Sequence, residues 1–314
     1  MLDVLEFDGH SVYDTSINNM NFHHLKWINS VNPTKEEKDL LKQYVGLSNL
    51  ELEKCLDPNE RPITSELEHF SLLIFKAPHK ALDRIHAPSF AILISKNLIV
   101  TIQKKEVDSI KKLWSVEEDH KHKLFHKGSS AIAYELLEMV MDHYFEILDD
   151  IEKEIDIVEN KVFHSTDKSS VKKIFKLKKT LIFFHKALAG NREVLLNITN
   201  DSSEKIDDKY IPKFMYVHED NIQLIDMTAT YRDILTSALD IYLSNESNNL
   251  NNIMKRMTAF ASFILIPTFI TGLYGMNFKF FPELSWKYGY LFAWGLIIAC
   301  IVGLYIYFKK KDWI

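Results

Sequence analysis

The sequence is poor in cysteine, with two among its 314 residues. Cys55 and Cys300 are too few for a disulfide framework or for a metal site built from thiolates, because both need several cysteines at short spacings. This scarcity excludes a small disulfide-stabilised domain and a cysteine-based zinc domain.

The sequence also lacks the motifs of common enzyme classes. It contains no Gly-x-x-x-x-Gly-Lys phosphate loop, no nucleophile elbow and no recognisable pair of catalytic carboxylates. The formal net charge of −5 is too mild to favour a nucleic-acid partner. We therefore expect no enzymatic activity, no organic cofactor, no ATP-driven transport and no nucleic-acid binding.

Charge is absent from two long apolar runs, residues 257–274 and 288–308. A helix of about 20 residues crosses the hydrocarbon core of a membrane, so both runs are candidate spans. A buried helical hairpin of a soluble protein is the other interpretation. The N-terminal sequence MLDVLEFDGHSVYDTS has no basic region followed by an apolar stretch, so we expect no signal peptide.

Basic residues flank these runs unevenly. Lys255 and Arg256 precede the first run and residues 309–311 are three lysines, whereas the linker carries Lys279 and Lys287. Because basic residues concentrate on the cytoplasmic side, we expect a multi-pass protein of the plasma (inner) membrane with both termini in the cytoplasm.

The region before residue 128 has a mixed α/β pattern. Short β-branched or apolar runs at 71–77, 89–95 and 97–103 predict consecutive strands that are buried on both faces. Thr34 followed by Glu37 is a capping-box signature and predicts a helix over 33–47.

Helical periodicity dominates from residue 129 onwards. The run 129–163 carries an acidic polar face, and the run 171–198 begins with lysines. A salt-bridged hairpin is one interpretation of this pair, and an acidic surface that attracts cations is the other. Residues 213–274 predict one helix that continues into the first apolar run.

Together these patterns predict an α+β cytoplasmic domain followed by long helices and a two-helix transmembrane hairpin. The expected parts are an N-terminal α/β domain (1–127), an antiparallel helical hairpin (128–200), a long stalk and pore helix (210–274), an external loop (275–287), a second span (288–308) and a basic cytoplasmic tail (309–314).

Two spans cannot enclose a pore alone, so a conducting chain must form a symmetric oligomer. One face of the long helix is small, apolar or neutral-polar and is a candidate pore lining. It comprises Asn251, Met254, Met257, Thr258, Ala261, Leu265, Thr268 and Gly272. Small-residue packing between membrane helices is the alternative for this face.

The sequence YGMNF directly after the first run, and PELSWKYGY leading into the second, resemble the CorA family of divalent-cation channels. Residues 231–278 resemble the long pore helix of that family throughout, and the resemblance covers the full chain. It implies a homopentameric funnel in the lipid bilayer, in which the long helix lines the pore and the second span packs outside it.

The resemblance implies a selectivity filter at Gly275, Met276 and Asn277. Mg²⁺ sheds its water reluctantly, and a ring of Asn277 amide oxygens would accept hydrogen bonds from the water around the ion. Gly275 would permit the turn that ends the helix. Glu283 is either an external attractor of cations or a solvated loop carboxylate.

The resemblance also implies regulation by cytoplasmic Mg²⁺ bound between subunits. Asp240 matches the acidic position on the long helix, and Asp83 of the next subunit is the expected partner. Leu265 would form a hydrophobic gate. Lys309, Lys310 and Lys311 would form a basic ring, although a positive-inside anchor explains them equally well.

Three functions stay open from the sequence. The first is a Mg²⁺ channel that also passes Co²⁺ and Ni²⁺, the second is a proton-coupled Zn²⁺ transporter of the same superfamily, and the third is a membrane-anchored scaffold or sensor. His120, His122 and His126 are either a transition-metal site or ordinary residues of a charged connecting stretch.

Overall fold

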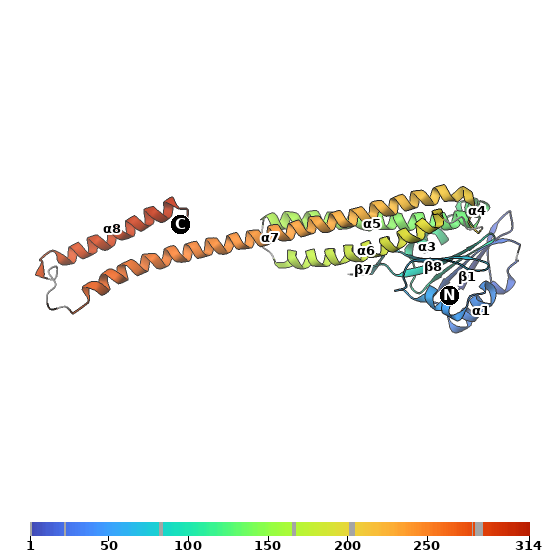
Figure 1. Ribbon diagram of the computed structural model, residues 1–314, viewed down its shortest axis with the longest axis horizontal. Helices are drawn as coiled ribbons and strands as arrows, with labels where there is room; N and C mark the ends of the chain where they lie inside the picture. Colours follow the sequence, from blue (N-terminus) through green and yellow to red (C-terminus); the bar gives the residue numbers. More distant parts are fainter. Residues whose placement is uncertain are drawn as a thin grey trace. The chain divides into compact units, whose positions relative to one another are not determined.

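A computed structural model describes residues 2–21, 23–81, 84–164, 168–200, 205–277, 279 and 285–314 (Figure 1). The chain divides into two compact units. The first holds the residues up to Lys161 and those from 167 to Ala238, and the second holds residues 162–166 and Leu239–Ile314.

The first unit contains all the described strands. They are β1 (Leu2–Phe7), β2 (Val12–Thr15), β3 (Leu25–Val31), β4 (Ile63–Glu66), β5 (Ser71–Lys76), β6 (His79–Ala81), β7 (Arg84–His86), β8 (Ser89–Ser95) and β9 (Leu98–Gln103). Seven of them form one sheet in the order β2-β1-β3-β9-β8-β5-β4, and β6 pairs with β7 in a separate hairpin. Neighbours in the large sheet are antiparallel except β3 and β9, which pair in parallel with Lys26 opposite Leu98. The three strands predicted from sequence are confirmed as the neighbours β5, β8 and β9.

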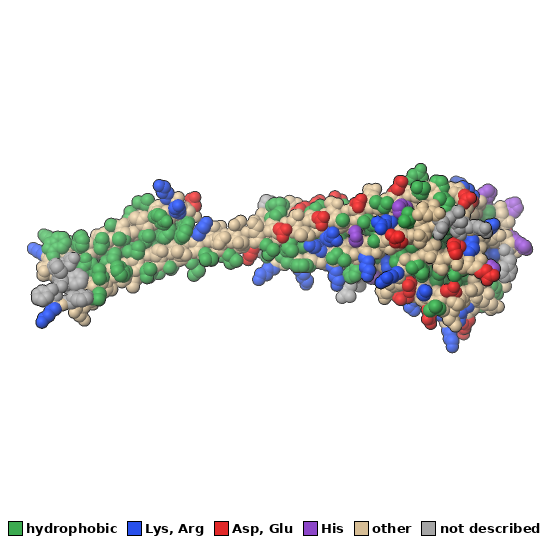
Figure 2. Space-filling view, in the orientation of Figure 1, with side chains coloured by type: hydrophobic (Ala, Val, Ile, Leu, Met, Phe, Trp, Pro, Cys, Tyr) green, Lys and Arg blue, Asp and Glu red, His purple; other side chains and the backbone are tan. Residues whose placement is uncertain are grey.

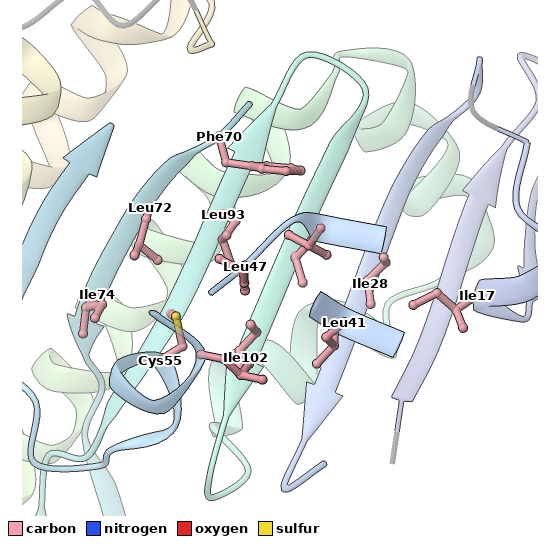
Figure 3. Close-up of a cluster of buried hydrophobic side chains, with 14 of the residues drawn as sticks. Ile17, Ile28, Leu41, Leu47, Cys55, Phe70, Leu72, Ile74, Leu93 and Ile102 are labelled. Atoms are coloured by element: carbon pink, nitrogen blue, oxygen red, sulfur yellow. The ribbon is translucent and has the colours of Figure 1, made fainter. Parts of the chain in front are cut away.

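Two short helices, α1 (Lys35–Val45) and α2 (Asn49–Leu56), cover one face of this sheet. Figure 3 shows Leu41 of α1 and Cys55 of α2 among side chains from β3, β5, β8 and β9. The Thr34–Glu37 capping box predicted from sequence is present at the start of α1. Ser48 and Glu51 form a second capping box before α2, which the sequence analysis missed.

Long helices lie against the other face of the sheet. They are α5 (Ser129–His164) and α6 (Lys168–Asn200), preceded by α3 (Asp108–Trp114) and α4 (Glu118–His126). The Tyr144 ring of α5 packs edge-on against Phe184 of α6 at 4.9 Å, and its hydroxyl donates to the Lys76 carbonyl of β5. Asn191 of α6, which is fully buried, accepts from the Lys76 N–H and donates to the same carbonyl.

The chain continues into one helix of 64 residues, α7 (Ile211–Tyr274), as its periodicity predicts. Within the first unit, α7 runs parallel to α5. The Tyr134 ring lies near Phe214, and further along both helices the Asn221 amide lies 3.8 Å from the Met141 sulfur. The last helix is α8 (Gly289–Lys310). Both α7 and α8 are long and apolar enough to cross a membrane.

Candidate functional site: the outer half of α7 and its contact with α8

Within the second unit, α7 packs on α8 through one face only. Ala259 and Ile270 are buried on that face, and Phe263 lies between them in half-buried position. On α8, Ile297 and Phe308 are buried, and the Phe263 and Phe308 rings meet edge to face at 5.9 Å. The spacing of 259, 263 and 270 is that of one helical stripe, so α8 covers a single side of α7.

The eight predicted pore-lining residues are all exposed in the single chain, and none of them is among the residues of α7 buried against α8. Met254 keeps 65% of its surface exposed and Leu265 keeps 68%. None of the eight is charged. The Thr268 hydroxyl donates to the Ile264 carbonyl at 2.8 Å, which leaves its oxygen as an acceptor on this face. The stripe therefore offers apolar groups and neutral acceptors to whatever lies against it.

The C-terminal end of this stripe leads into the Gly275-Met276-Asn277 sequence. α7 ends at Tyr274, and the Gly275 N–H still donates to the Thr271 carbonyl at 2.9 Å. Gly275 directly follows the last residue of α7, and among the described glycines only Gly9, Gly46 and Gly128 have positive φ, so the chain leaves the helix here without a left-handed cap at Gly275. A Cβ at Gly275 would lie 3.2 Å from the Thr271 carbonyl oxygen, so close backbone contact accounts for the glycine.

Asn277 is exposed and is the last residue of this segment before a gap in the described chain. Met276 is also exposed, at 47%. Glu283 lies outside the described residues.

Pro267 interrupts the hydrogen-bond ladder of α7 on its α8 side, because proline has no N–H. The carbonyl that loses its backbone donor is that of Phe263, four residues earlier, and the Thr271 hydroxyl donates instead to the Pro267 carbonyl at 2.9 Å. An apolar cavity of about 570 Å³ lies between Pro267, Ile270, Trp294 and their neighbours on α7 and α8.

The N-terminal end of the stripe is rich in amide side chains. Asn251, Met254 and Thr258 line a groove of about 400 Å³ together with Lys255 and Trp313, which follows α8. Two more asparagines, at 248 and 252, complete the α7 side of this groove. Trp313 therefore lines the same groove as three residues of the predicted pore lining.

The predicted regulatory acids are only partly described. Asp240 is exposed on α7, and Asp83 lies outside the described residues. Within the described part of the chain, no three histidine, cysteine or acidic side chains converge on a point that could hold a metal ion.

The predicted histidine site near residue 120 has a different role. His122 and His126 pack around the Phe7 ring, at 5.4 and 6.5 Å between ring centroids. His120 instead pairs with Glu135 of α5. The three histidines therefore follow the alternative interpretation, as ordinary residues of this connecting stretch.

The acidic face of α5 is partly neutralised by neighbouring lysines. Lys173 of α6 lies 3.5 Å from Glu154, which fits the salt-bridged hairpin. Asp150, however, pairs with Lys80 of the β6–β7 hairpin at 3.1 Å. Partial burial raises the pKa of Asp142, with a further contribution from the nearby Glu146 charge.

Comparison with known proteins gives consistent matches over the whole chain. Residues 22–310 match the family described as CorA-like Mg²⁺ transporter protein. The chain is 34% identical to the cobalt/magnesium transport protein CorA of Methanocaldococcus jannaschii over 318 residues, covering 98% of this chain and 97% of that one. The CorA of Thermotoga maritima is 31% identical over 274 residues, covering 87% and 78%. The solved structure of the complete M. jannaschii CorA magnesium transporter superposes with a TM-score of 0.91 at 31% identity, covering 100% of this chain and 99% of that one.

Proposed function

The chain belongs to the CorA-like Mg²⁺ transporter family, and we propose that it is a homopentameric channel that conducts Mg²⁺ into the cytoplasm across the plasma membrane. Its relatives are divalent-cation transport proteins rather than enzymes, and its two apolar helices make it a membrane protein. In the proposed orientation both termini are cytoplasmic. Co²⁺ is a second proposed cargo, because the two relatives are described as cobalt/magnesium transport proteins.

One observation carries the proposal. The uncharged stripe of α7 stays exposed along its length, opposite the face that α8 covers, and leads to Asn277 at the outer end. Five copies arranged with α8 outward would turn this stripe into a continuous lining. Figure 2 shows how widely hydrophobic side chains cover the surface of the two span helices, as a lipid-facing surface requires.

Selectivity would reside in the ring of Asn277 amides. A carboxylate ring would hold a divalent cation tightly, whereas an amide ring can bind the water shell of Mg²⁺ and release it. The hydrophobic Leu265 ring is the proposed gate further in. A ring of lysines from positions 309–311 would surround the inner end.

The proposed regulation uses Asp240. Cytoplasmic Mg²⁺ bound by Asp240 and an acid of the next subunit would stabilise the closed state, and its loss would leave like charges that separate the subunits. Asp83 stays the predicted partner. Replacing Asp240 by Asn should raise the internal Mg²⁺ concentration that stops influx, and an unchanged inhibition curve would exclude Asp240 from regulation.

The test of the proposed function is Mg²⁺ influx into proteoliposomes that hold the purified full-length protein. Asn277→Ala should lower influx by at least about tenfold, because five amide hydrogen bonds of roughly 1 kcal/mol each are lost. Asn249→Ala is the matched control, since Asn249 is also exposed on α7 but lies off the stripe. Influx of Zn²⁺ that depends on a proton gradient, with little Mg²⁺ influx, would assign the chain to zinc transport instead. If intact oligomers pass neither ion, the result would favour the membrane-anchored scaffold or sensor.

A further inference from the structure

The β6–β7 hairpin is a small element that stands outside the large sheet. Its two strands have three residues each and pair with one another, and β7 contacts α6 (Figure 1). A two-stranded hairpin is marginally stable by itself, so its position depends on the surface against which it packs. Asp83, the predicted ligand of regulatory Mg²⁺, lies in the sequence between the two strands.

Three histidines meet where this hairpin faces α5. His79 of β6 and His86 of β7 are cross-strand partners, with ring centroids 5.2 Å apart and planes 68° from parallel. His143 of α5 is close enough to His79 for a charge on one ring to act on the other. The Nδ1 atoms of His79 and His143 are buried, and neither has a hydrogen-bond partner among the described residues. A protonated imidazole donates from both nitrogens, so protonation of either ring would leave a buried N–H without an acceptor.

The charges around His143 come from α3, α5 and the hairpin. Asp108 of α3 and Glu146 of α5 favour its protonated form. Lys112 of α3 and a charge on His79 oppose that form, and Lys112 lies 3.8 Å from the Glu146 carboxylate. Burial is the largest effect, and it holds the pKa of His143 below its usual range. His143 is therefore neutral near pH 7.

The other charged groups around the hairpin belong to side chains of a different type. Lys80 of β6 pairs with Asp150 of α5 at 3.1 Å, two helical turns from His143 on the same face of α5. Both partners are exposed, so this pair contributes about 0–1 kcal/mol. On the α6 side, the charge of Lys186 acts on Lys76, which ends β5 just before the hairpin. Among these residue types, histidine is the one that normally changes its charge between pH 5 and 8.

Resting on the proposed function, we propose that His79, His86 and His143 form a proton-sensitive contact that holds the β6–β7 hairpin on α5. In a mildly acidic cytoplasm, protonation places like charges next to one another and leaves a buried N–H unpaired, so the hairpin loosens. A loosened hairpin holds its predicted Mg²⁺ ligand less firmly, which weakens the inhibition of influx by internal Mg²⁺. Influx therefore continues to a higher internal Mg²⁺ concentration when the cytoplasm is acidic.

Hydrogen exchange of the full-length protein measures the hairpin directly. His143→Gln and His79→Gln remove one titrating ring each. His69→Gln is the matched control, because His69 is an exposed histidine elsewhere in the same unit. Protection factors of peptides that cover residues 77–88 are compared near pH 7.5 and near pH 6.0, after correction for the direct effect of pH on exchange. Gel filtration establishes that the oligomer of each variant is intact.

We expect the protection of the wild-type hairpin to fall by about three- to fourfold between these pH values. The pKa of His143 is lowered from 6.5, so the packing is fully stable above that pH and loses stability as the pH falls below it. His143→Gln should remove most of the fall, and His79→Gln should reduce it, since the like charge beside His143 is then absent. His69→Gln should keep the wild-type fall.

Mg²⁺ influx into proteoliposomes tests the consequence for regulation. With the external pH held constant, the internal Mg²⁺ concentration that halves influx should rise by a similar factor when the internal pH is lowered from 7.5 to 6.0. The same rise is expected for His69→Gln, whereas His143→Gln should show little change.

Three results would overturn parts of this proposal. Equal protection of the wild-type hairpin at both pH values would exclude the proton-sensitive contact, and so would an unchanged pH dependence in both His143→Gln and His79→Gln. An inhibition curve that does not respond to internal pH, while the hairpin loosens, would exclude its link to regulation. Failure of the proposed function is distinguishable, because the wild type would then show no influx that depends on Asn277, whereas hydrogen exchange reports on the hairpin whether or not the protein conducts.

Discussion

Asn191 is the residue whose replacement gives the clearest quantitative test of the cytoplasmic fold. Its side chain is fully buried, and it makes two hydrogen bonds to the backbone of Lys76, at 2.9 Å to the N–H and 2.8 Å from the amide to the carbonyl. It thus attaches α6 to the end of β5. Asn191→Ala removes both bonds while keeping a helix-forming residue.

The two bonds contribute unequally. The Lys76 carbonyl keeps a bond from the Tyr144 hydroxyl at 3.1 Å, so it stays satisfied in the variant. The Lys76 N–H loses this partner in a part-buried site, at a cost of about 1–3 kcal/mol. The better helix propensity of alanine returns roughly 0.5 kcal/mol. We therefore expect the free energy of opening at this contact to fall by about 1.5 kcal/mol.

Hydrogen exchange measured by mass spectrometry on the full-length protein checks this value. A loss of about 1.5 kcal/mol corresponds to roughly tenfold faster exchange in peptides from β5 and α6. Asn197→Ala is the control, because Asn197 lies on the same helix and is exposed. Equal exchange rates in the two variants would refute the assignment of Asn191 as an attachment point.

Two further predictions concern titratable groups outside the membrane. Burial raises the pKa of Cys55 to about 12, so a maleimide should leave Cys55 of the folded protein unmodified and react with it only after denaturation. The pKa of Asp142 is higher in the folded protein than in the unfolded chain, so the folded protein loses stability as the pH rises through these two pKa values and the carboxyl ionises. Asp142→Asn should therefore raise the thermal midpoint near pH 7 and have no benefit near pH 3. Asp150→Asn should have the opposite sign, because hydrogen bonding and charge from a lysine hold the pKa of Asp150 below its usual range. Midpoints of both variants that shift in the same direction would contradict this reasoning.

The helices and the uncharged stripe were predictable from sequence because each follows a local rule. Periodicity and the absence of Gly and Pro over most of α7 were enough to predict its length. The Thr34–Glu37 spacing was enough to place the start of α1. The uncharged stripe also follows from the helical period, because residues three or four positions apart lie on one face of α7. Its identification as one face therefore needed no tertiary information.

β3 was missed because its polar residues look like surface residues. Asn29 and Ser30 are both buried. The Asn29 amide oxygen accepts hydrogen bonds from the Thr101 hydroxyl and the Gln103 amide of β9, at 3.0 and 2.8 Å. A buried polar network of this kind breaks the alternation on which strand prediction depends, and its partners lie more than 70 positions away.

The position of Trp313 was also beyond local rules. A tryptophan after a span is typical of the membrane interface, and the sequence alone gives that interpretation. Its stacking on Phe308 depends on Asp312 adopting a left-handed backbone, which this residue type tolerates but does not signal.

The parallel pairing of β3 with β9 has a consequence for biosynthesis. Leu98 follows Val31 by 67 positions, so at about 5–20 residues per second roughly 3–13 s separate the synthesis of the two strands. During that time β1 can pair with both β2 and β3 on the ribosome, but the other edge of β3 has no strand to pair with. An open edge of this kind is where newly made chains associate wrongly. The nascent protein is therefore most vulnerable before residue 103 has emerged, long before either membrane helix has been made.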